Sequence, residues 1–109
     1  MGDSGGASGG VGNLPTRVAD NPELSRYEIF VGNTLAGFTT YRLRPEHRIV
    51  ALHSEVFPEF EHHGLAGVLA REMLDDIRAR GLRVAPRCPF VAKYIREHPE
   101  YSDLVSDIA

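Results

Sequence analysis

The first half of the folded chain alternates apolar and polar residues in the way that strands do. Tyr27, Ile29 and Val31 alternate with polar or smaller neighbours, and the dipeptide Gly32-Asn33 that follows is typical of a hairpin turn. Residues 35–43 then form the returning strand of the pattern. We therefore predict an antiparallel hairpin in this part of the chain, with folded structure beginning near residue 17.

A third strand is predicted over residues 48–56. Its apolar positions include Ile49 and Val50, and the break at residues 44–47 separates it from the hairpin. Pro58 ends it, because proline has no N–H to donate to a strand ladder.

The clearest helical pattern covers residues 63–80. Apolar residues recur at the spacing that places them on one face of a helix, and Gly81 is a natural residue for the turn after its C-terminus. The apolar stripe consists of Leu65, Leu69, Met73 and Ile77, widened by Ala66, Val68, Ala70 and Leu74.

A short strand over residues 82–85 and a second helix over residues 89–97 follow, with a further helical turn predicted within residues 101–109. His98 and Pro99 stop the second helix. The order is three antiparallel strands, a long helix, another strand and a short helix, which predicts an α+β (mixed α/β) domain.

The 109 residues suffice for one domain. Residues 1–14 are rich in Gly and Ser and are expected to form a flexible tail, which leaves 15–109 as the domain. The net charge is −3, and the eleven Arg and one Lys are dispersed, which argues against general nucleic-acid binding.

Cys88 is the single cysteine, so no internal disulfide can form. The chain has no secretory signal and no apolar run near the ~20 residues that a membrane span needs. These features predict a cytoplasmic protein without membrane association.

Cys88 is also the strongest candidate for chemistry. Pro89 favours the first turn of a helix, which places Cys88 at the N-cap, and Arg87 lies beside it. Helix N-termini and neighbouring cations lower the pKa of a thiol and favour the nucleophilic thiolate. The alternative is that Cys88 is a small buried apolar residue.

The start of the long helix is a second candidate site. Gly64, Ala66 and Gly67 are small, so a ligand can approach the backbone N–H groups there, and the helix dipole favours phosphate or pyrophosphate. The alternative is ordinary turn chemistry. The GxxxxGK[ST] and GxGxxG phosphate-binding patterns are absent from the sequence.

Three stretches together resemble the GNAT superfamily of acetyl-CoA-dependent N-acetyltransferases, and within it the short, single-domain, cysteine-bearing branch. They are DNPELSRYEIFVGNTLAGFTTYRL, HSEVFPEFEHHGLAGVLAREMLDDIRARGLRV and CPFVAKYIREHPEY, and the resemblance covers about residues 17–105. It implies a GNAT-like fold in which the central strand splays from its neighbour. It also implies acetyl transfer from acetyl-CoA, as co-substrate, to an amine.

The resemblance implies two sets of cofactor-binding residues, with Pro89, Phe90 and Tyr94 of the predicted helix over residues 89–97 beside them. The pantetheine arm would run along Glu55, Val56 and Phe57. The pyrophosphate would be surrounded by His62, His63, Gly64, Leu65, Ala66, Gly67 and Val68.

This chain departs from the family pattern at one position. Larger relatives carry (Q/R)xxGx(G/A), whereas this chain reads EHHGLA, with Glu61 where Gln or Arg is usual. A carboxylate pointing inward there would repel phosphate, and protonated His62 or His63 would compensate. The short branch also lacks the N-terminal helices that build an amine pocket. The acceptor is therefore left open among a protein lysine, a polyamine and a small metabolite. The sequence also leaves the oligomeric state open.

Cys88, His53 and Glu55 are the catalytic candidates. His53 and Glu55 are two residues apart on a predicted strand, so their side chains share one face, and either could act as a base. Direct attack of the amine on the thioester and transfer through an acetyl-Cys88 intermediate both remain open. A CoA-binding module without catalysis is the alternative function.

No metal site is predicted. The group Glu59, Glu61, His62 and His63 lacks an HExxH pattern or a cysteine pair.

Overall fold

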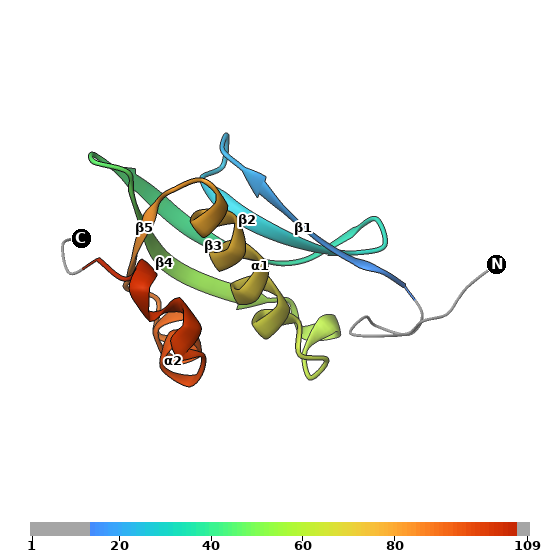
Figure 1. The fold of residues 1–109 in the computed structure, drawn as a ribbon. Helices are drawn as coiled ribbons and strands as arrows, with labels where there is room; N and C mark the ends of the chain where they lie inside the picture. Colours follow the sequence, from blue (N-terminus) through green and yellow to red (C-terminus); the bar gives the residue numbers. More distant parts are fainter. Residues whose placement is uncertain (1–13, 107–109) are drawn as a thin grey trace.

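The computed structural model describes residues 14–106, which form one five-stranded sheet with two helices and two 3-10 turns (Figure 1). The strands lie in the order β1-β2-β3-β4-β5. The elements are β1 Thr16–Asn21, β2 Arg26–Val31, β3 Thr34–Arg44, β4 Arg48–Val56, η1 Pro58–Phe60, α1 Leu65–Ala79, β5 Arg83–Pro86, α2 Pro89–Glu97 and η2 Pro99–Leu104. The predicted tail lies almost wholly outside the described residues.

The predicted elements are confirmed, with small shifts at their ends. The β2–β3 hairpin, β4 and α2 have the predicted positions. The helix α1 begins at Leu65 rather than at residue 63, because His62 (φ 70°) and Gly64 (φ 75°) adopt left-handed backbone conformations that a right-handed helix cannot include. The C-terminal turn η2 begins at Pro99, earlier than predicted.

The prediction of three antiparallel strands was wrong by one strand. β1 also belongs to the sheet and pairs antiparallel with β2 at its edge. Its sequence, TRVADN, escapes a pattern search because Val18 is the one larger apolar residue that packs against the core. An edge strand with one buried contact shows little apolar alternation.

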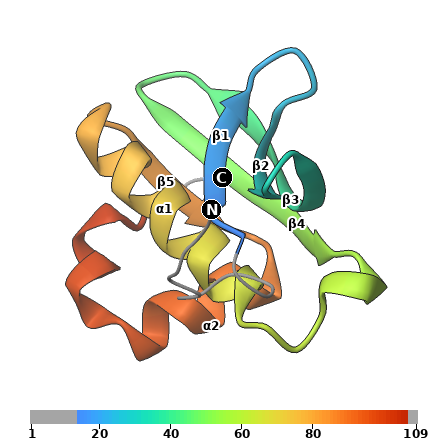
Figure 2. The ribbon, with the colours of Figure 1, turned by 90° about the vertical axis from the view of Figure 1, so that its right-hand side faces the viewer.

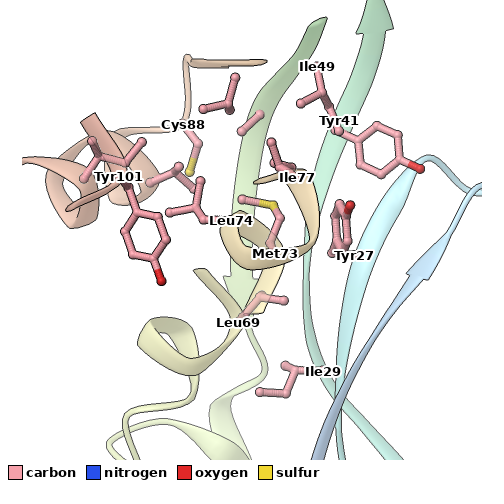
Figure 3. Close-up of a cluster of buried hydrophobic side chains, with 14 of the residues drawn as sticks. Tyr27, Ile29, Tyr41, Ile49, Leu69, Met73, Leu74, Ile77, Cys88 and Tyr101 are labelled. Atoms are coloured by element: carbon pink, nitrogen blue, oxygen red, sulfur yellow. The ribbon is translucent and has the colours of Figure 1, made fainter. Parts of the chain in front are cut away.

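Helix α1 lies along one face of the sheet, with α2 packed beside it (Figure 2). The predicted stripe of α1 forms the core: Leu69, Met73 and Ile77 are fully buried between the helix and the strands. Figure 3 shows Tyr27 and Tyr41 on one side of this cluster, and Cys88 and Tyr101 on the other. No helix of residues 14–106 is long and apolar enough to cross a membrane.

A polar network fastens the edge of the sheet to α1. The Tyr27 hydroxyl donates to Asp76 (2.6 Å) and the Tyr41 hydroxyl donates to Asp20 (2.6 Å), while the Arg80 guanidinium contacts both carboxylates. Burial, together with the adjacent carboxylates, raises the pKa of both tyrosines well above the usual value. Both phenols therefore keep their protons at neutral pH and act as donors.

The sheet opens between β4 and β5. These strands are parallel, and they pair only from Arg48 to Ala51 on β4, although β4 continues to Val56. Beyond Ala51, no strand within residues 14–106 pairs with β4 on this side. This is the splay that the family resemblance implied.

A β-bulge in β4 lies at the same point. On β3, the neighbours Thr40 and Tyr41 pair with His53 and Ala51, so Leu52 is an extra residue on β4. A bulge of this kind reverses which side chains face each side of the sheet. Ile49 and Ala51 belong to the core before the bulge, and Ser54 faces the helices after it.

Candidate functional site

Cys88 lies where β4 and β5 separate. It is the N-cap residue of α2, as predicted, and its backbone N–H donates to the carbonyl oxygen of Ala51 (2.8 Å). Ala51 is also the last residue of β4 that pairs with β5. The side chain of Cys88 makes no capping hydrogen bond and is only 2% exposed. The thiol is therefore held at the closed end of the opening, against the core.

The thiol takes part in a short chain of hydrogen bonds. The Cys88 Sγ donates to the Ser54 Oγ (3.3 Å), and the Ser54 Oγ lies 2.8 Å from the Thr39 Oγ1. Thr39 is 1% exposed and pairs with Ser54 in the β3–β4 ladder. Sequence reasoning missed both hydroxyl residues, because the alternation of β4 before its bulge assigns Ser54 to the outer face. Only the bulge turns Ser54 toward the thiol.

The other two catalytic candidates lie on the opposite face of β4. Adjacent residues of a strand point to opposite faces, so His53 and Glu55 point away from the side on which Ser54 meets Cys88. Their side chains are exposed and face each other, with His53 Nε2 3.5 Å from Glu55 Oε1. The structure thus confirms that they share a face, but it does not bring them to the thiol. Their catalytic role stays a prediction.

A pocket of about 370 Å³ lies at the N-terminus of α1. It unites most of the predicted pyrophosphate residues with one residue of β4, and it also includes Phe60, which the sequence did not suggest. Its lining is Val56, Phe60, Glu61, His62, Gly64, Leu65 and Ala66. The first intrahelical bond of α1 runs from the Val68 N–H to the Gly64 carbonyl, so the preceding amides of the first turn have no acceptor within the helix.

Glu61 lines this pocket, so the departure from the family pattern is part of the site itself. The neighbouring His62 lines it as well, whereas His63 is exposed and absent from the lining. Of these two histidines, His62 is therefore the one placed to offset the carboxylate.

Several other predicted cofactor residues lie outside the pocket. Phe57 packs edge-on against Phe38, the residue paired with Glu55 on the outer face. Val68 packs against the core. Gly67 faces α2 instead, because a Cβ there would lie 3.9 Å from Tyr94 Cε2.

Tyr94 stands on α2 beside the start of α1. Its ring stacks on His98 with 3.9 Å between ring centres, and burial raises the pKa of its phenol. Tyr94 therefore keeps its proton at neutral pH and is suited to donate a hydrogen bond rather than to act as a base. Pro89 begins α2, and Phe90 is 37% exposed. Among residues 14–106, no group of three or more His, Cys, Asp or Glu side chains is arranged to hold a metal ion.

The link between the thiol and the pocket runs along β4. Ser54 accepts from Cys88, and Val56, two residues later on the same face, lines the pocket at α1. Two strand residues span roughly 7 Å. Within the described residues, the site thus combines a strand whose edge is unpaired beyond Ala51, a helix N-terminus that suits phosphate, and a thiol at the closed end of the opening, an arrangement typical of an acyl-CoA-binding α/β domain.

Comparison with known proteins agrees with this architecture. Residues 26–104 match the family model described as GCN5-related N-acetyltransferase, and the chain belongs to this family. The fold resembles the NMR structure of a GCN5-like protein from Staphylococcus aureus, with a TM-score of 0.63, 18% identity, and coverage of 85% of this chain and 90% of that one.

A second solved structure with a similar fold is a GNAT-family protein from Desulfovibrio desulfuricans. It has a TM-score of 0.50 and 22% identity, and the match covers 69% of this chain and 52% of that one. No curated protein matches the chain. Membership of the family implies acetyl transfer from acetyl-CoA.

Proposed function

We propose that this protein transfers the acetyl group of acetyl-CoA to an amine, and that the acetyl group passes through Cys88. The observation that carries the proposal is the continuity along β4. Ser54 contacts the thiol, and Val56 lines the pocket at the start of α1. A pantetheine arm on the unpaired edge of β4 would therefore connect a pyrophosphate at α1 with a thioester near Cys88.

The residues present fit such a co-substrate. The first-turn amides of α1 supply donors and a positive dipole end for the pyrophosphate, and Gly64 leaves the approach open because nothing lies within 4 Å of its Cβ position. Beyond Ala51, the β4 backbone has no strand partner on the β5 side among the described residues, so it can pair with the amides of pantetheine. The negative charge of Glu61, which lines this pocket, repels the phosphates and limits the affinity for acetyl-CoA.

The proposed chemistry has two balanced steps. In the first, the Cys88 sulfur bonds to the thioester carbonyl carbon, the carbon–sulfur bond to CoA breaks, and the thiol proton leaves on the CoA thiol. In the second, the amine nitrogen bonds to the acetyl carbon, the bond to Cys88 breaks, and a proton of the amine returns to the thiol. Tyr94 retains its proton and can donate to a developing charge, and Ser54 orients the thiol.

Intact-mass measurement after incubation with acetyl-CoA tests the covalent step. We expect one acetyl adduct, absent in Cys88→Ser, which a primary amine discharges. A protein that acetylates the amine at an undiminished rate as Cys88→Ser would overturn the acetyl-Cys88 route in favour of direct attack.

Thermal stabilisation tests the co-substrate separately. A ligand that binds only the native state raises the melting temperature, so acetyl-CoA should do so for the wild type and for Cys88→Ser. No shift at millimolar acetyl-CoA would refute the proposal. Stabilisation without transfer to any of a wide set of amines would favour the non-catalytic CoA-binding module.

A further inference from the structure

A second pocket lies on the face of the sheet away from the helices. It has a volume of about 390 Å³, and its lining is Arg42, Arg44, Val50, Leu52 and Arg87. Arg42 pairs with Val50 in the β3–β4 ladder, so the two side chains share a face, and Arg44 lies two residues further along the same strand. The third arginine comes from the joint between β5 and α2.

The three arginines that line this pocket share the absence of an acidic partner. In the described part of the chain, none of them has a carboxylate partner, although the protein carries a net charge of −3. By contrast, Arg26, Arg71, Arg78 and Arg80 each form an ion pair with an acidic side chain. Three guanidinium groups without acidic partners repel each other around a pocket that also contains Val50 and Leu52. A bound anion would relieve that repulsion.

The pocket borders the site where acetyl transfer is proposed. Arg87 immediately precedes Cys88, and Leu52 immediately follows Ala51, whose carbonyl oxygen accepts from the Cys88 N–H. The thiol and the α1 pocket lie on the helix side of the sheet, whereas this pocket lies on the other face, where Arg42 and Val50 pair just before β4 and β5 separate. Two of the pocket residues, Leu52 and Arg87, are thus the immediate chain neighbours of the two residues that close the opening, Ala51 and Cys88.

We propose that Arg42, Arg44 and Arg87 form an anion pocket that binds a carboxylate of the acceptor while its amine enters the opening beside Cys88. The proposal rests on the proposed acetyl transfer and narrows its acceptor. Guanidinium groups bind carboxylates through paired, charge-assisted hydrogen bonds. They repel cations, so a polyamine is a poor acceptor, and an amine that bears a carboxylate is a good one.

Anion binding is tested first, without acetyl-CoA. Glutarate, titrated at ionic strength held constant with chloride, should raise the melting temperature of the wild type in a saturable way. The variant Arg42→Gln/Arg44→Gln should lose this response. Arg96→Gln is the matched control, because Arg96 is exposed on α2 and has no carboxylate partner among the described residues. An equal response in all three proteins, or none in the wild type, would overturn the pocket.

The acceptor preference is tested with three amines of one chain length. We expect kcat/KM to fall in the order 5-aminopentanoate, pentylamine, cadaverine, with at least about a tenfold advantage of the first over the second, as expected for a charge-assisted hydrogen bond. In Arg42→Gln/Arg44→Gln the advantage should vanish, whereas Arg96→Gln should keep it. Equal use of the three amines by the wild type would refute the assignment of the acceptor.

Two further kinetic comparisons distinguish which anion the pocket binds: a carboxylate of the acceptor or a phosphate of CoA. Lysine peptides with a neighbouring Glu or Gln show whether a peptide carboxylate is used in the same way as a small-molecule one. A rise in KM for acetyl-CoA, but not for dephospho-acetyl-CoA, in the double variant would show that the pocket holds the CoA phosphate, contrary to the proposal. If no amine is acetylated, the proposed acetyl transfer fails, and the glutarate titration decides the pocket independently.

Discussion

Removal of the Ser54 hydroxyl should destabilise the fold through Thr39, which Ser54 contacts from across the β3–β4 ladder. Thr39 is almost completely buried, and among residues 14–106 the hydrogen bond to Ser54 (2.8 Å) is the only one that its side chain makes. In Ser54→Ala the hydroxyl of Thr39 therefore has no partner. A buried polar group left without its partner costs about 1–3 kcal/mol.

The expected loss is large enough to measure. A change of 1 kcal/mol lowers the melting temperature of a domain of this size by roughly 4–8 °C. The bond from the Cys88 thiol contributes less, because S–H is a weak donor, so most of the cost should come from Thr39. We expect Ser54→Ala to lower the urea midpoint without changing the slope of the transition.

A double-mutant cycle isolates the hydrogen bond. Thr39→Val removes the other hydroxyl, and a pair of apolar side chains leaves nothing unpaired, so Ser54→Ala/Thr39→Val should be more stable than the sum of the two single losses predicts. The expected coupling is about 1 kcal/mol. Strictly additive losses, or a Ser54→Ala protein as stable as the wild type, would refute this account of the hydroxyl pair.

The remaining predictions concern the sheet, the core and alkaline pH. Gly37→Ala should cost about 1–3 kcal/mol in urea unfolding, because its Cβ would lie 2.4 Å from the Glu55 carbonyl oxygen, whereas the control Gly67→Ala, with ordinary contacts, should not destabilise. Met73→Ala, at a fully buried position, should cost about 2–5 kcal/mol, and a loss below 1 kcal/mol would contradict the packing of the core. Burial and a hydrogen bond to the Asp75 carboxylate raise the pKa of Tyr101 to about 12. The contribution of Tyr101 to the free energy of unfolding is therefore intact below pH 10 and is lost between pH 10 and 12. Tyr101→Phe should reduce the loss of stability over this pH range, and an unchanged dependence of stability on pH would refute the prediction.

Local patterns in the sequence were sufficient for most elements. The apolar spacing of α1, the turn at Gly32-Asn33 and the break at Pro58 each act over a few neighbouring residues, so they are readable without knowledge of the fold. The same holds for Cys88, because Pro89 fixes the start of α2 and places the cysteine at its N-cap. The family resemblance added the splay of β4 and the identity of the co-substrate.

The tertiary structure decided which side chains meet. The edge strand β1 depends on its pairing with β2, and the extra residue Leu52 shows itself only in the β3–β4 register. That single bulge turns Ser54 toward Cys88 and leaves His53 facing outward, because side chains alternate along a strand and one inserted residue reverses the alternation.

The proposed anion pocket also depends on the pairing of distant strands. Arg42, Arg44 and Arg87 look dispersed in the sequence, and strand pairing brings them around one hollow. The sequence by itself therefore determined the elements and the position of the thiol, because those depend on near neighbours. The faces, the partners of the thiol and the arginine pocket depend on register between distant strands, which only the folded sheet fixes.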